Sequence, residues 1–193
     1  NTAGHEATIS ISHSGSKLFL YRSDGALYGD IWYSEFRDGK WHPPVKLPEP
    51  LNSPYWEGSA SLSLDEKTIY FASNRPDGLG GKDLYKSEQQ TDGSWGPAVS
   101  LGAEVNTPYD EDAPYIHANS EVLYFSSKGF NSIGGYDVFI ARRLPGGGWD
   151  KPQNIGYPIN TAGDDALFAI SDDGLRSYFS SERLHGHGAQ DIY

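Results

Sequence analysis

The chain has 193 residues, of which 26 are acidic and 15 basic, so its formal net charge is −11, and it contains neither Cys nor Met. The acidic balance argues against nucleic acids and anionic membrane surfaces as partners, because a surface that binds phosphate groups is basic. The lack of Cys excludes disulfides, Cys-ligated zinc and catalytic thiols, and no apolar run approaches the length that spans a bilayer. We therefore expect a domain that does not span a membrane and whose 5 Trp, 13 Tyr and 8 Phe build a packed core.

A repeat organises the chain. The opening Asn1-Thr-Ala-Gly returns as Asn52-Ser-Pro-Tyr, Asn106-Thr-Pro-Tyr and Asn160-Thr-Ala-Gly, at intervals of 51, 54 and 54 residues. Other positions keep the same step, among them Tyr70-Phe71, Tyr124-Phe125 and Tyr178-Phe179, the Asp residues 30, 83, 137 and 191, and the Trp residues 41, 95 and 149. These positions predict four units, 1–51, 52–105, 106–159 and 160–193, in a single domain or a segment of one. Since the last unit ends inside its third strand, we expect the chain to be a piece of a longer protein.

The second unit shows the strands that we expect in every unit. They are 58–64, 68–73, 83–87 and a fourth strand that follows Trp95 and ends at Leu101. Residues 64–67 have the composition of a tight turn, and the Gly-rich loop 74–82 separates the second strand from the third. Repeated units of this kind predict an all-β fold, a β-propeller of four-stranded antiparallel blades with about three and a half blades present. A β-solenoid has shorter repeats, and an immunoglobulin-like sandwich does not repeat its whole strand set.

Three strings resemble the TolB-type, WD-like propeller repeat: 106–116 with 123–127 and 134–139, then 70–85, and then 171–181. The combination of Tyr-Phe-Ser-Ser, Gly-Gly-Tyr-Asp and Trp-x-x-Pro is typical of OmpA-family envelope proteins of Bacteroidetes, in which such propellers lie beside tetratricopeptide and peptidoglycan-binding modules. A component of type IX secretion has this layout. The resemblance covers essentially the whole chain and implies a periplasmic interaction module without catalytic activity. The first unit departs most from the pattern, because it lacks the Gly-Gly pair.

An acidic position recurs just before the first strand of each unit. It is occupied by Glu6, Glu57, Glu111 and Asp165, and its acidic neighbours are Asp110, Asp112 and Asp164. Because the first strand of a propeller blade is innermost, these carboxylates are candidates for a ring at the channel mouth that binds a basic peptide, a cation or Ca²⁺. The alternative is a structural latch, in which each carboxylate accepts hydrogen bonds from backbone N–H groups of a neighbouring blade. We expect mutual repulsion to raise the pKa in a ring, and hydrogen bonds to lower the pKa in a latch.

A basic residue and an acidic residue flank each loop between the second and third strands. The pairs are Arg22 with Asp30, Arg75 with Asp83, Lys128 with Asp137, and Arg183 with Asp191. Because both ends of such a loop meet in space, we predict an ion pair that clamps the loop. The functional alternative is an Arg cluster for anionic ligands, but the box that marks sialidase blades is not present in proper form.

Aromatic side chains form two further groups. The repeated Trp residues are expected to pack between blades, whereas Tyr55, Trp56 and Tyr109 lie in loops beside the acidic position and are candidates for contact with a sugar or peptide. The sequence contains no nucleophile elbow, phosphate-binding loop or His-Glu-x-x-His motif.

The sequence favours a non-enzymatic scaffold module without a cofactor, whose partners are envelope proteins or peptide segments and not nucleic acids. It is expected in the periplasm or at the outer membrane of a bacterium. The alternative is a glycan- or peptide-active hydrolase, or a lectin, on the same fold. A hydrolase would need catalytic groups in one blade only, whereas the acids recur in all four units.

Overall fold

Four antiparallel sheets follow one another along the chain, one for each sequence repeat. The computed structural model describes residues 4–23, 28–183, 186 and 189–193, and every regular element within these ranges is a β-strand. The prediction of an all-β fold built from antiparallel units is confirmed. In the described part of the chain, no helix could cross a membrane.

The strands are numbered along the chain. The first sheet contains β1 (His5–Ile11), β2 (Lys17–Ser23), β3 (Asp30–Arg37), β4 (Lys40–Trp41) and β5 (Val45–Lys46). The second contains β6 (Glu57–Leu62), β7 (Thr68–Ser73), β8 (Asp83–Glu88) and β9 (Val99–Ser100). The third contains β10 (Glu111–Ile116), β11 (Val122–Ser127), β12 (Asp137–Arg142) and β13 (Gln153–Asn154). The fourth contains β14 (Asp165–Ile170), β15 (Ser177–Ser181) and β16 (Asp191–Ile192).

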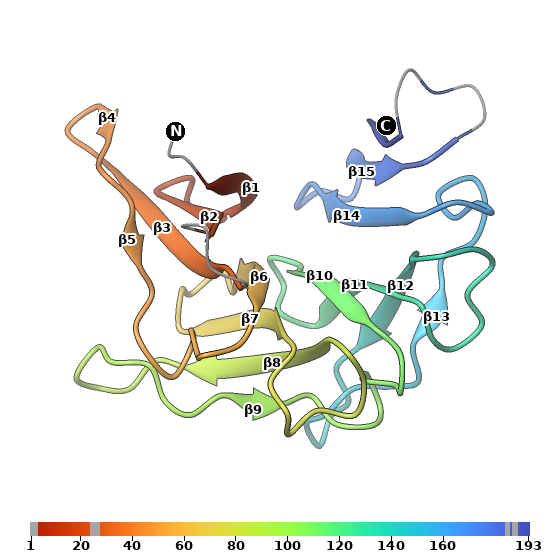
Figure 1. Ribbon diagram of the computed structural model, residues 1–193, viewed down its shortest axis with the longest axis horizontal. Helices are drawn as coiled ribbons and strands as arrows, with labels where there is room; N and C mark the ends of the chain where they lie inside the picture. Colours follow the sequence, from red (N-terminus) through yellow and green to blue (C-terminus); the bar gives the residue numbers. More distant parts are fainter. Residues whose placement is uncertain (1–3, 24–27, 184–185, 187–188) are drawn as a thin grey trace.

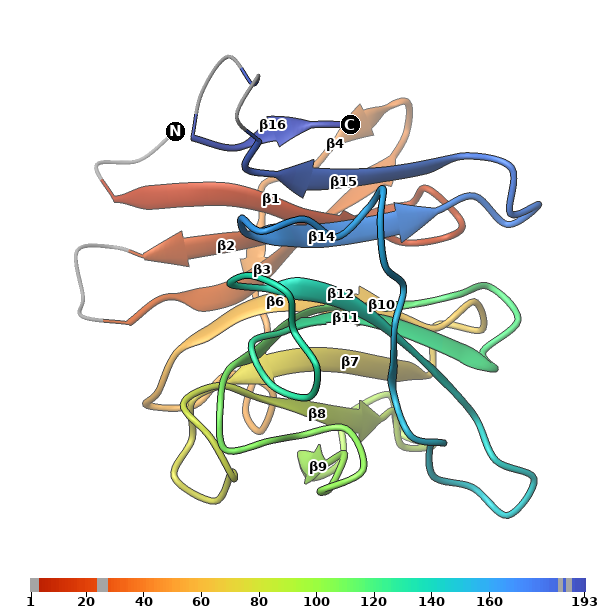
Figure 2. The ribbon, with the colours of Figure 1, turned by 90° about the vertical axis from the view of Figure 1, so that its right-hand side faces the viewer.

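The sheets are arranged as the blades of a propeller, with the first strand of each blade innermost (Figure 1). The inner strands β1, β6, β10 and β14 together line an axial cavity of about 390 Å³. Successive inner strands contact one another, but β1 and β14 do not, and Figure 1 shows the first and last blades facing each other across an opening. In the side view of Figure 2 the strands of the blades lie roughly one above another.

Side chains pack between the blades in two clusters. Along β7, Tyr70 and Ala72 belong to the cluster with the third blade, and Ile69 and Phe71 to the cluster with the first blade. This alternation is the period of two of a β-strand, and both faces of β7 are buried. Each large side chain buried in this way contributes about 1.5–3 kcal/mol to folding.

The hairpin turn between the first two strands has the same backbone conformation in every blade. The equivalent residues are Gly15, Glu66, Ser120 and Gly174, with φ between 58° and 71°. The tight turn expected at 64–67 is present, and the second strand of that blade runs over Thr68–Ser73 as predicted.

Far-UV circular dichroism is expected to show an antiparallel β spectrum, because the described chain has no helix. A helical content above about 15 % would contradict the fold, since an average soluble domain is about one third helix.

Candidate functional site

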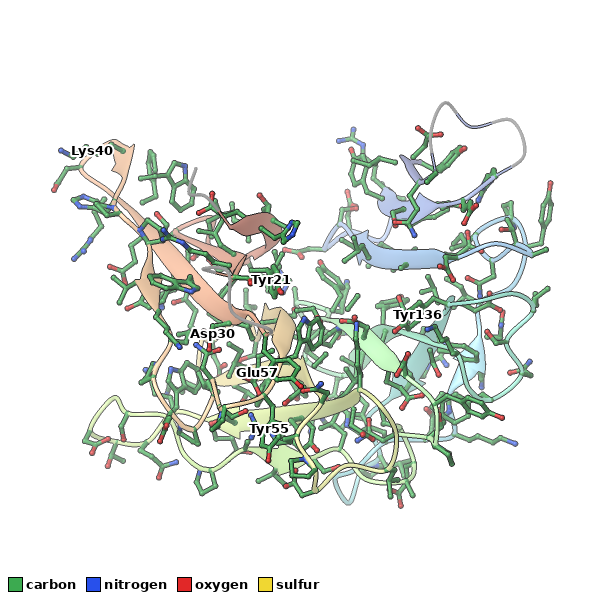
Figure 3. All side chains as sticks on the ribbon, in the orientation of Figure 1. Tyr21, Asp30, Lys40, Tyr55, Glu57 and Tyr136 are labelled. Atoms are coloured by element: carbon green, nitrogen blue, oxygen red, sulfur yellow. The ribbon has the colours of Figure 1, made fainter. Side chains whose placement is uncertain are left out.

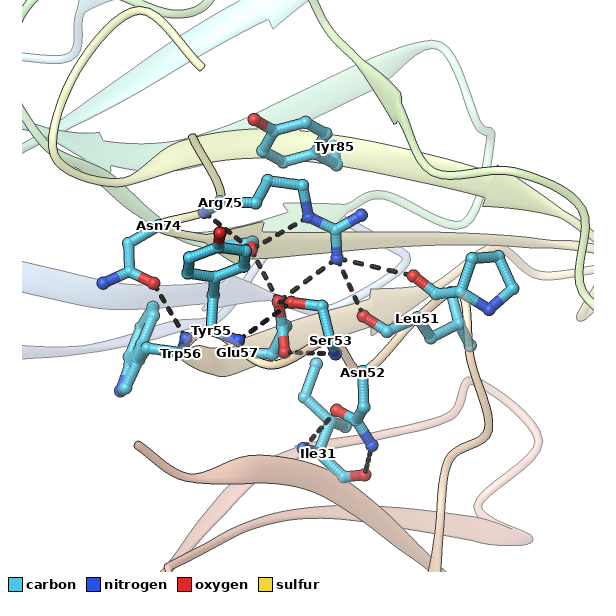
Figure 4. A network of polar contacts seen from close by, with 12 residues as sticks. Ile31, Leu51, Asn52, Ser53, Tyr55, Trp56, Glu57, Asn74, Arg75 and Tyr85 are labelled. Atoms are coloured by element: carbon cyan, nitrogen blue, oxygen red, sulfur yellow. Dashed lines mark hydrogen bonds and ion pairs between the residues drawn. The ribbon is translucent and has the colours of Figure 1, made fainter. Parts of the chain in front are cut away.

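The repeated Asn is buried against the third strand of the preceding blade at Asn52, Asn106 and Asn160. Asn106 accepts a hydrogen bond from Leu84 N at 2.8 Å and donates to Leu84 O at 3.0 Å, so its amide continues the hydrogen bonding of β8 beyond the short outer strand β9. Asn52 does the same for Ile31 at 2.8 and 2.9 Å, as Figure 4 shows, and Asn160 for Val138 at 2.8 and 2.8 Å. The repeat is evident in the sequence, but this role of its Asn was not predicted. The signal was available, because a side-chain amide is the group that can both donate to and accept from one backbone residue.

The repeated carboxylate begins the inner strand and holds the turn that precedes it. Glu57 accepts hydrogen bonds from Ser53 N at 2.9 Å, Ser53 Oγ at 2.6 Å and Ser73 Oγ at 2.6 Å, and it pairs with Arg75 Nη2 at 3.2 Å (Figure 4). All these donors belong to the same repeat. The carboxylate therefore ties the Asn-Ser-Pro-Tyr turn to the end of β7.

The next two blades reproduce this arrangement. Glu111 accepts from Thr107 N at 2.8 Å, Thr107 Oγ1 at 2.6 Å and Ser127 Oγ at 2.7 Å. Asp165 accepts from Thr161 N and Oγ1 and from Ser181 Oγ. In the first blade Glu6 pairs with Arg22 at 3.2 Å, while the matching Asn1 and Thr2 lie outside the described residues.

The link to the preceding blade comes from the backbone of the same residues. Glu57 N donates to Gly29 O at 3.1 Å, Glu111 N to Lys82 O at 2.8 Å, and Asp165 N to Tyr136 O at 2.6 Å. We expected a latch in which the carboxylate itself reached a neighbouring blade. That expectation is wrong about the partner of the carboxylate. The backbone N–H of the acidic residue bonds the preceding blade, whereas its carboxylate accepts hydrogen bonds from its own repeat.

The channel mouth is not a ring of these carboxylates. Glu57, Glu111 and Asp165 each have 0 % exposed surface, so the alternative in which they face a ligand in the channel is wrong. The axial cavity is instead lined by mainly apolar side chains, including Ile9, Ile11, Ala60, Tyr115, Leu167 and Phe168. In the described part of the chain, no three His, Asp or Glu side chains are grouped so that they could hold a metal ion.

The acidic neighbours also have partners within the fold. Asp112 pairs with Lys82 at 2.8 Å and accepts from Ser59 Oγ at 2.5 Å, and Asp110 pairs with Lys128 at 3.0 Å. Asp164 accepts from Tyr136 N at 2.8 Å. Each of these acids contacts another blade or the end of its own inner hairpin, which is the behaviour of architectural groups.

Burial raises the pKa of Glu111 to about 7, although its hydrogen bonds from Thr107 and Ser127 act in the opposite direction, and the charge of Asp83 raises it further. We expected hydrogen bonding in a latch to lower the pKa. For Glu111 that sign is wrong, because the loss of hydration outweighs the hydrogen bonds.

Because of Glu111, the unfolding free energy of the chain is expected to fall as the pH rises. The pKa of Glu111 is higher in the folded chain than its ordinary value of 4.5, so protonation stabilises the fold. This contribution is complete below the pKa of the unfolded chain and is lost as the pH rises through about 7. The unfolding free energy of wild type relative to Glu111→Gln should therefore drop by about 2–3 kcal/mol between about pH 5 and about pH 8. Urea titrations of both proteins measure it, and parallel pH profiles would contradict it.

The predicted clamp between Arg75 and Asp83 is wrong. Arg75 contacts Glu57 and the backbone oxygens of Pro50 and Leu51, and its guanidinium lies over the ring of Tyr85 at 4.9 Å. Its side chain is largely buried, and in this way it fixes the turn that leads from the first blade into the second. Sequence separation favoured Asp83, but the fold places Glu57 opposite the end of β7.

Asp83 and Asp137 instead accept backbone hydrogen bonds from their own Gly-rich loops. Asp83 accepts from Leu79 N and Gly80 N at 3.0 Å each, so it closes the Gly-rich loop by itself. The predicted Lys128–Asp137 pair is also wrong, since Asp137 accepts from Ile133 N at 2.6 Å and Asn154 Nδ2 at 2.7 Å. Asp30 pairs with Lys46 at 2.7 Å. Arg183 donates hydrogen bonds to Ser181 Oγ, Pro158 O and Ile159 O, and Asp191 begins β16 opposite Ser181.

Double-mutant cycles are expected to show this choice of partner. The coupling free energy between Arg75→Ala and Glu57→Ala should be about 2 kcal/mol or more, because the pair is buried. Coupling between Arg75→Ala and Asp83→Ala should stay below about 0.5 kcal/mol. Equal coupling in the two cycles would contradict the assignment.

The aromatic groups divide between core and surface, but not entirely as expected. Trp41 is 42 % exposed and contacts Phe36 of its own blade, so the expectation that it packs between blades is wrong. Trp149 is buried against Tyr70 of the preceding blade, with ring centroids 6.2 Å apart. Trp56, which was predicted with Tyr55 and Tyr109 as a loop aromatic for ligand contact, instead packs against a core cluster, with Lys82 Nζ 4.0 Å from its ring centroid. In contrast, Tyr55 and Tyr109 are 39 % and 62 % exposed in equivalent turns before β6 and β10. Figure 3 shows Tyr55 close to Glu57 on the second blade.

The turns before β10 and β14 are held in place by the Gly-Gly pair of the preceding loop. A Cβ on Gly80 would lie 1.8 Å from Tyr109 O, and one on Gly81 would lie 2.4 Å from Asp110 Oδ1. Gly134 and Gly135 approach the fourth blade equally closely. The loops of the second and third blades therefore pack directly on the turn of the blade that follows, and the exposed Tyr109 lies on the first of these two junctions.

Comparison with solved structures identifies propellers. A TolB-like protein of Agrobacterium tumefaciens has a TM-score of 0.60 at 16 % identity, with 92 % of this chain and 55 % of that chain covered. An alpha-L-arabinofuranosidase of Lactobacillus brevis has a TM-score of 0.56 at 14 % identity over 98 % and 70 %. An endo-arabinase of Bacteroides thetaiotaomicron has a TM-score of 0.56 at 16 % identity over 97 % and 72 %. The chain thus spans about half the length of the TolB-like propeller, and these similarities concern the fold.

No protein-family model and no curated protein matches the sequence.

Proposed function

We propose that this chain is a non-catalytic interaction and scaffold propeller of a bacterial cell-envelope protein, acting in the periplasm or at the outer membrane. The observation that carries the proposal concerns the repeated acids. Glu57, Glu111 and Asp165 are all buried, and their carboxylates accept hydrogen bonds that hold the preceding turns in place. The TolB-like neighbour in fold and the repeat's resemblance to OmpA-family envelope proteins support the compartment. In its more specific form, the proposal is that this envelope protein is associated with type IX secretion.

The interaction surface would be the end of the propeller at which the inner strands begin. Tyr55 and Tyr109 project there from rigid turns, and the Lys82–Asp112 pair lies between their blades. Exposed tyrosines on rigid turns supply contact area at low entropic cost, and a charged pair beside them adds polar contacts. This combination suits a peptide segment of another envelope protein.

Two assays test the proposal together. The purified chain should release no product from a panel of arabinans, other glycans and peptides. Immobilised chain should retain a partner from a bacterial envelope extract, and Tyr109→Ala should lose it. Leu175→Ala is the matched control, because Leu175 is 81 % exposed at the opposite end of the inner strands. Turnover on any substrate, or equal retention by Tyr109→Ala, would contradict the proposal.

A glycan-active hydrolase or a lectin is the second candidate. It is favoured by the fold similarity to an arabinofuranosidase and an endo-arabinase, together with the exposed Tyr55 and Tyr109. Saccharide binding without turnover, lost in Tyr109→Ala, would favour the lectin, and turnover would favour the hydrolase.

A further inference from the structure

We infer that His13 and Asp172 form a proton-dependent bridge that fastens the first blade to the last at one end of the axial cavity. His13 lies in the hairpin between β1 and β2, and Asp172 lies in the hairpin between β14 and β15. The inner strands of these two blades do not contact each other. The bridge therefore spans the opening between the blades where strand pairing does not.

Both ring nitrogens of His13 face groups that only accept hydrogen bonds. Nε2 lies 3.2 Å from Ile116 O, and Nδ1 lies 3.3 Å from Asp172 Oδ1. A neutral imidazole has one N–H group, so it satisfies one of these acceptors and turns a lone pair toward the other. The imidazolium ion donates to both. Protonation of His13 thus completes a three-blade contact among the first, third and fourth blades.

The surroundings of the ring set the size of the effect. The His13 side chain is only 9 % exposed, whereas that of Asp172 is 63 % exposed, so solvent screens one side of the pair. Tyr115 of β10 faces the ring at a centroid distance of 6.1 Å, and its hydroxyl donates to Ile170 O at 2.6 Å. On the adjacent hairpins Lys17 forms an ion pair with Glu66, so the charges of these two residues largely cancel near the ring.

The consequence is that the first and last blades are held together at one end of the cavity under acidic conditions and are not held together there under basic conditions. Tyr115, which faces the His13 ring, lines the cavity, and so does Ile11, two residues before His13, so the bridge lies at the wall of that cavity. A change of pH would then alter how firmly the two end blades are held, without altering the interfaces between successive blades.

The distance between the end blades is the direct readout. Because the chain has no Cys, Val45→Cys and Leu175→Cys can carry two spin labels, one on the first blade and one on the last. Both positions are exposed. We expect a narrow distance distribution at about pH 5.5 and a broader one at about pH 8 in the wild-type background. His13→Gln and Asp172→Asn should each give the broad distribution at both pH values.

A matched control is available in the third blade. His117 lies in the β10–β11 hairpin, where its Nδ1 accepts from Asn119 N, and His117→Gln should keep the pH response of wild type. A melting experiment adds a second measurement: Asp172→Asn should lower the Tm by about 1 to 4 °C at about pH 5.5 and leave it unchanged at about pH 8. A distance distribution that does not change with pH, or a pH response that survives in Asp172→Asn, would overturn the inference.

Discussion

Replacing Glu57 with Ala is expected to lower the unfolding free energy by about 3–5 kcal/mol, the cost of leaving a buried charge without its partner. Arg75 would lose its counter-charge, and Ser53 N and the hydroxyls of Ser53 and Ser73 would lose their acceptor. Urea denaturation monitored by the fluorescence of the five Trp residues measures the change.

Two variants control this prediction. Glu57→Gln keeps the shape and one acceptor oxygen but removes the charge, so its loss should lie between those of wild type and Glu57→Ala. Arg75→Ala in the Glu57→Ala background should restore part of the stability, because no unpaired cation then remains. A Glu57→Ala variant within about 1 kcal/mol of wild type would show that the carboxylate does not hold the turn.

Asn106→Ala is expected to lower the unfolding free energy by about 2–4 kcal/mol. Its side chain pairs with both Leu84 N and Leu84 O, and its amide also donates to Ser100 Oγ at 3.0 Å. Leu84 has 0 % exposed surface, so its N–H group would be left buried and unsatisfied at a cost of about 1–3 kcal/mol, while Leu84 O would keep its hydrogen bond from Leu101 N. The hydrogen bonds that Asn106 donates to Leu84 O and Ser100 Oγ would add about 1 kcal/mol to the loss.

Asn119→Ala is the matched control for Asn106→Ala. Asn119 is exposed in the β10–β11 turn and accepts one hydrogen bond from Glu121 N at 2.9 Å, so its loss should stay below about 1 kcal/mol. Similar losses in the two variants would contradict the bridging role of the repeated Asn.

The architecture was predictable from sequence because repeated positions report on repeated contacts. The spacing of Asn52, Asn106 and Asn160 marked the blades, and the β-forming run at 68–73 became β7 with its predicted bounds. Alternation within that run reflects packing on two neighbouring blades, which a propeller requires of its middle strands.

The partners of charged side chains were not predictable in the same way. Arg75 is nearer to Asp83 in sequence, yet it pairs with Glu57 because antiparallel pairing of β6 and β7 places Glu57 opposite Ser73. Sequence spacing also gives no measure of burial, and burial decides both the accessibility of the acidic position and the sign of the pKa shift of Glu111. The sequence therefore showed correctly that these acidic residues occupy equivalent positions in the blades. Which partners their side chains face depended on the fold.

Calcium titration of wild type and Glu111→Gln by thermal unfolding tests most directly the claim that the repeated carboxylates serve architecture and bind no ligand. Any ligand that binds the folded chain alone raises its Tm by mass action. Buried, hydrogen-bonded carboxylates predict that millimolar Ca²⁺ leaves both Tm values unchanged at about pH 7.5, where most Glu111 is ionised. A calcium-dependent rise in the Tm of wild type that Glu111→Gln abolishes would contradict the account.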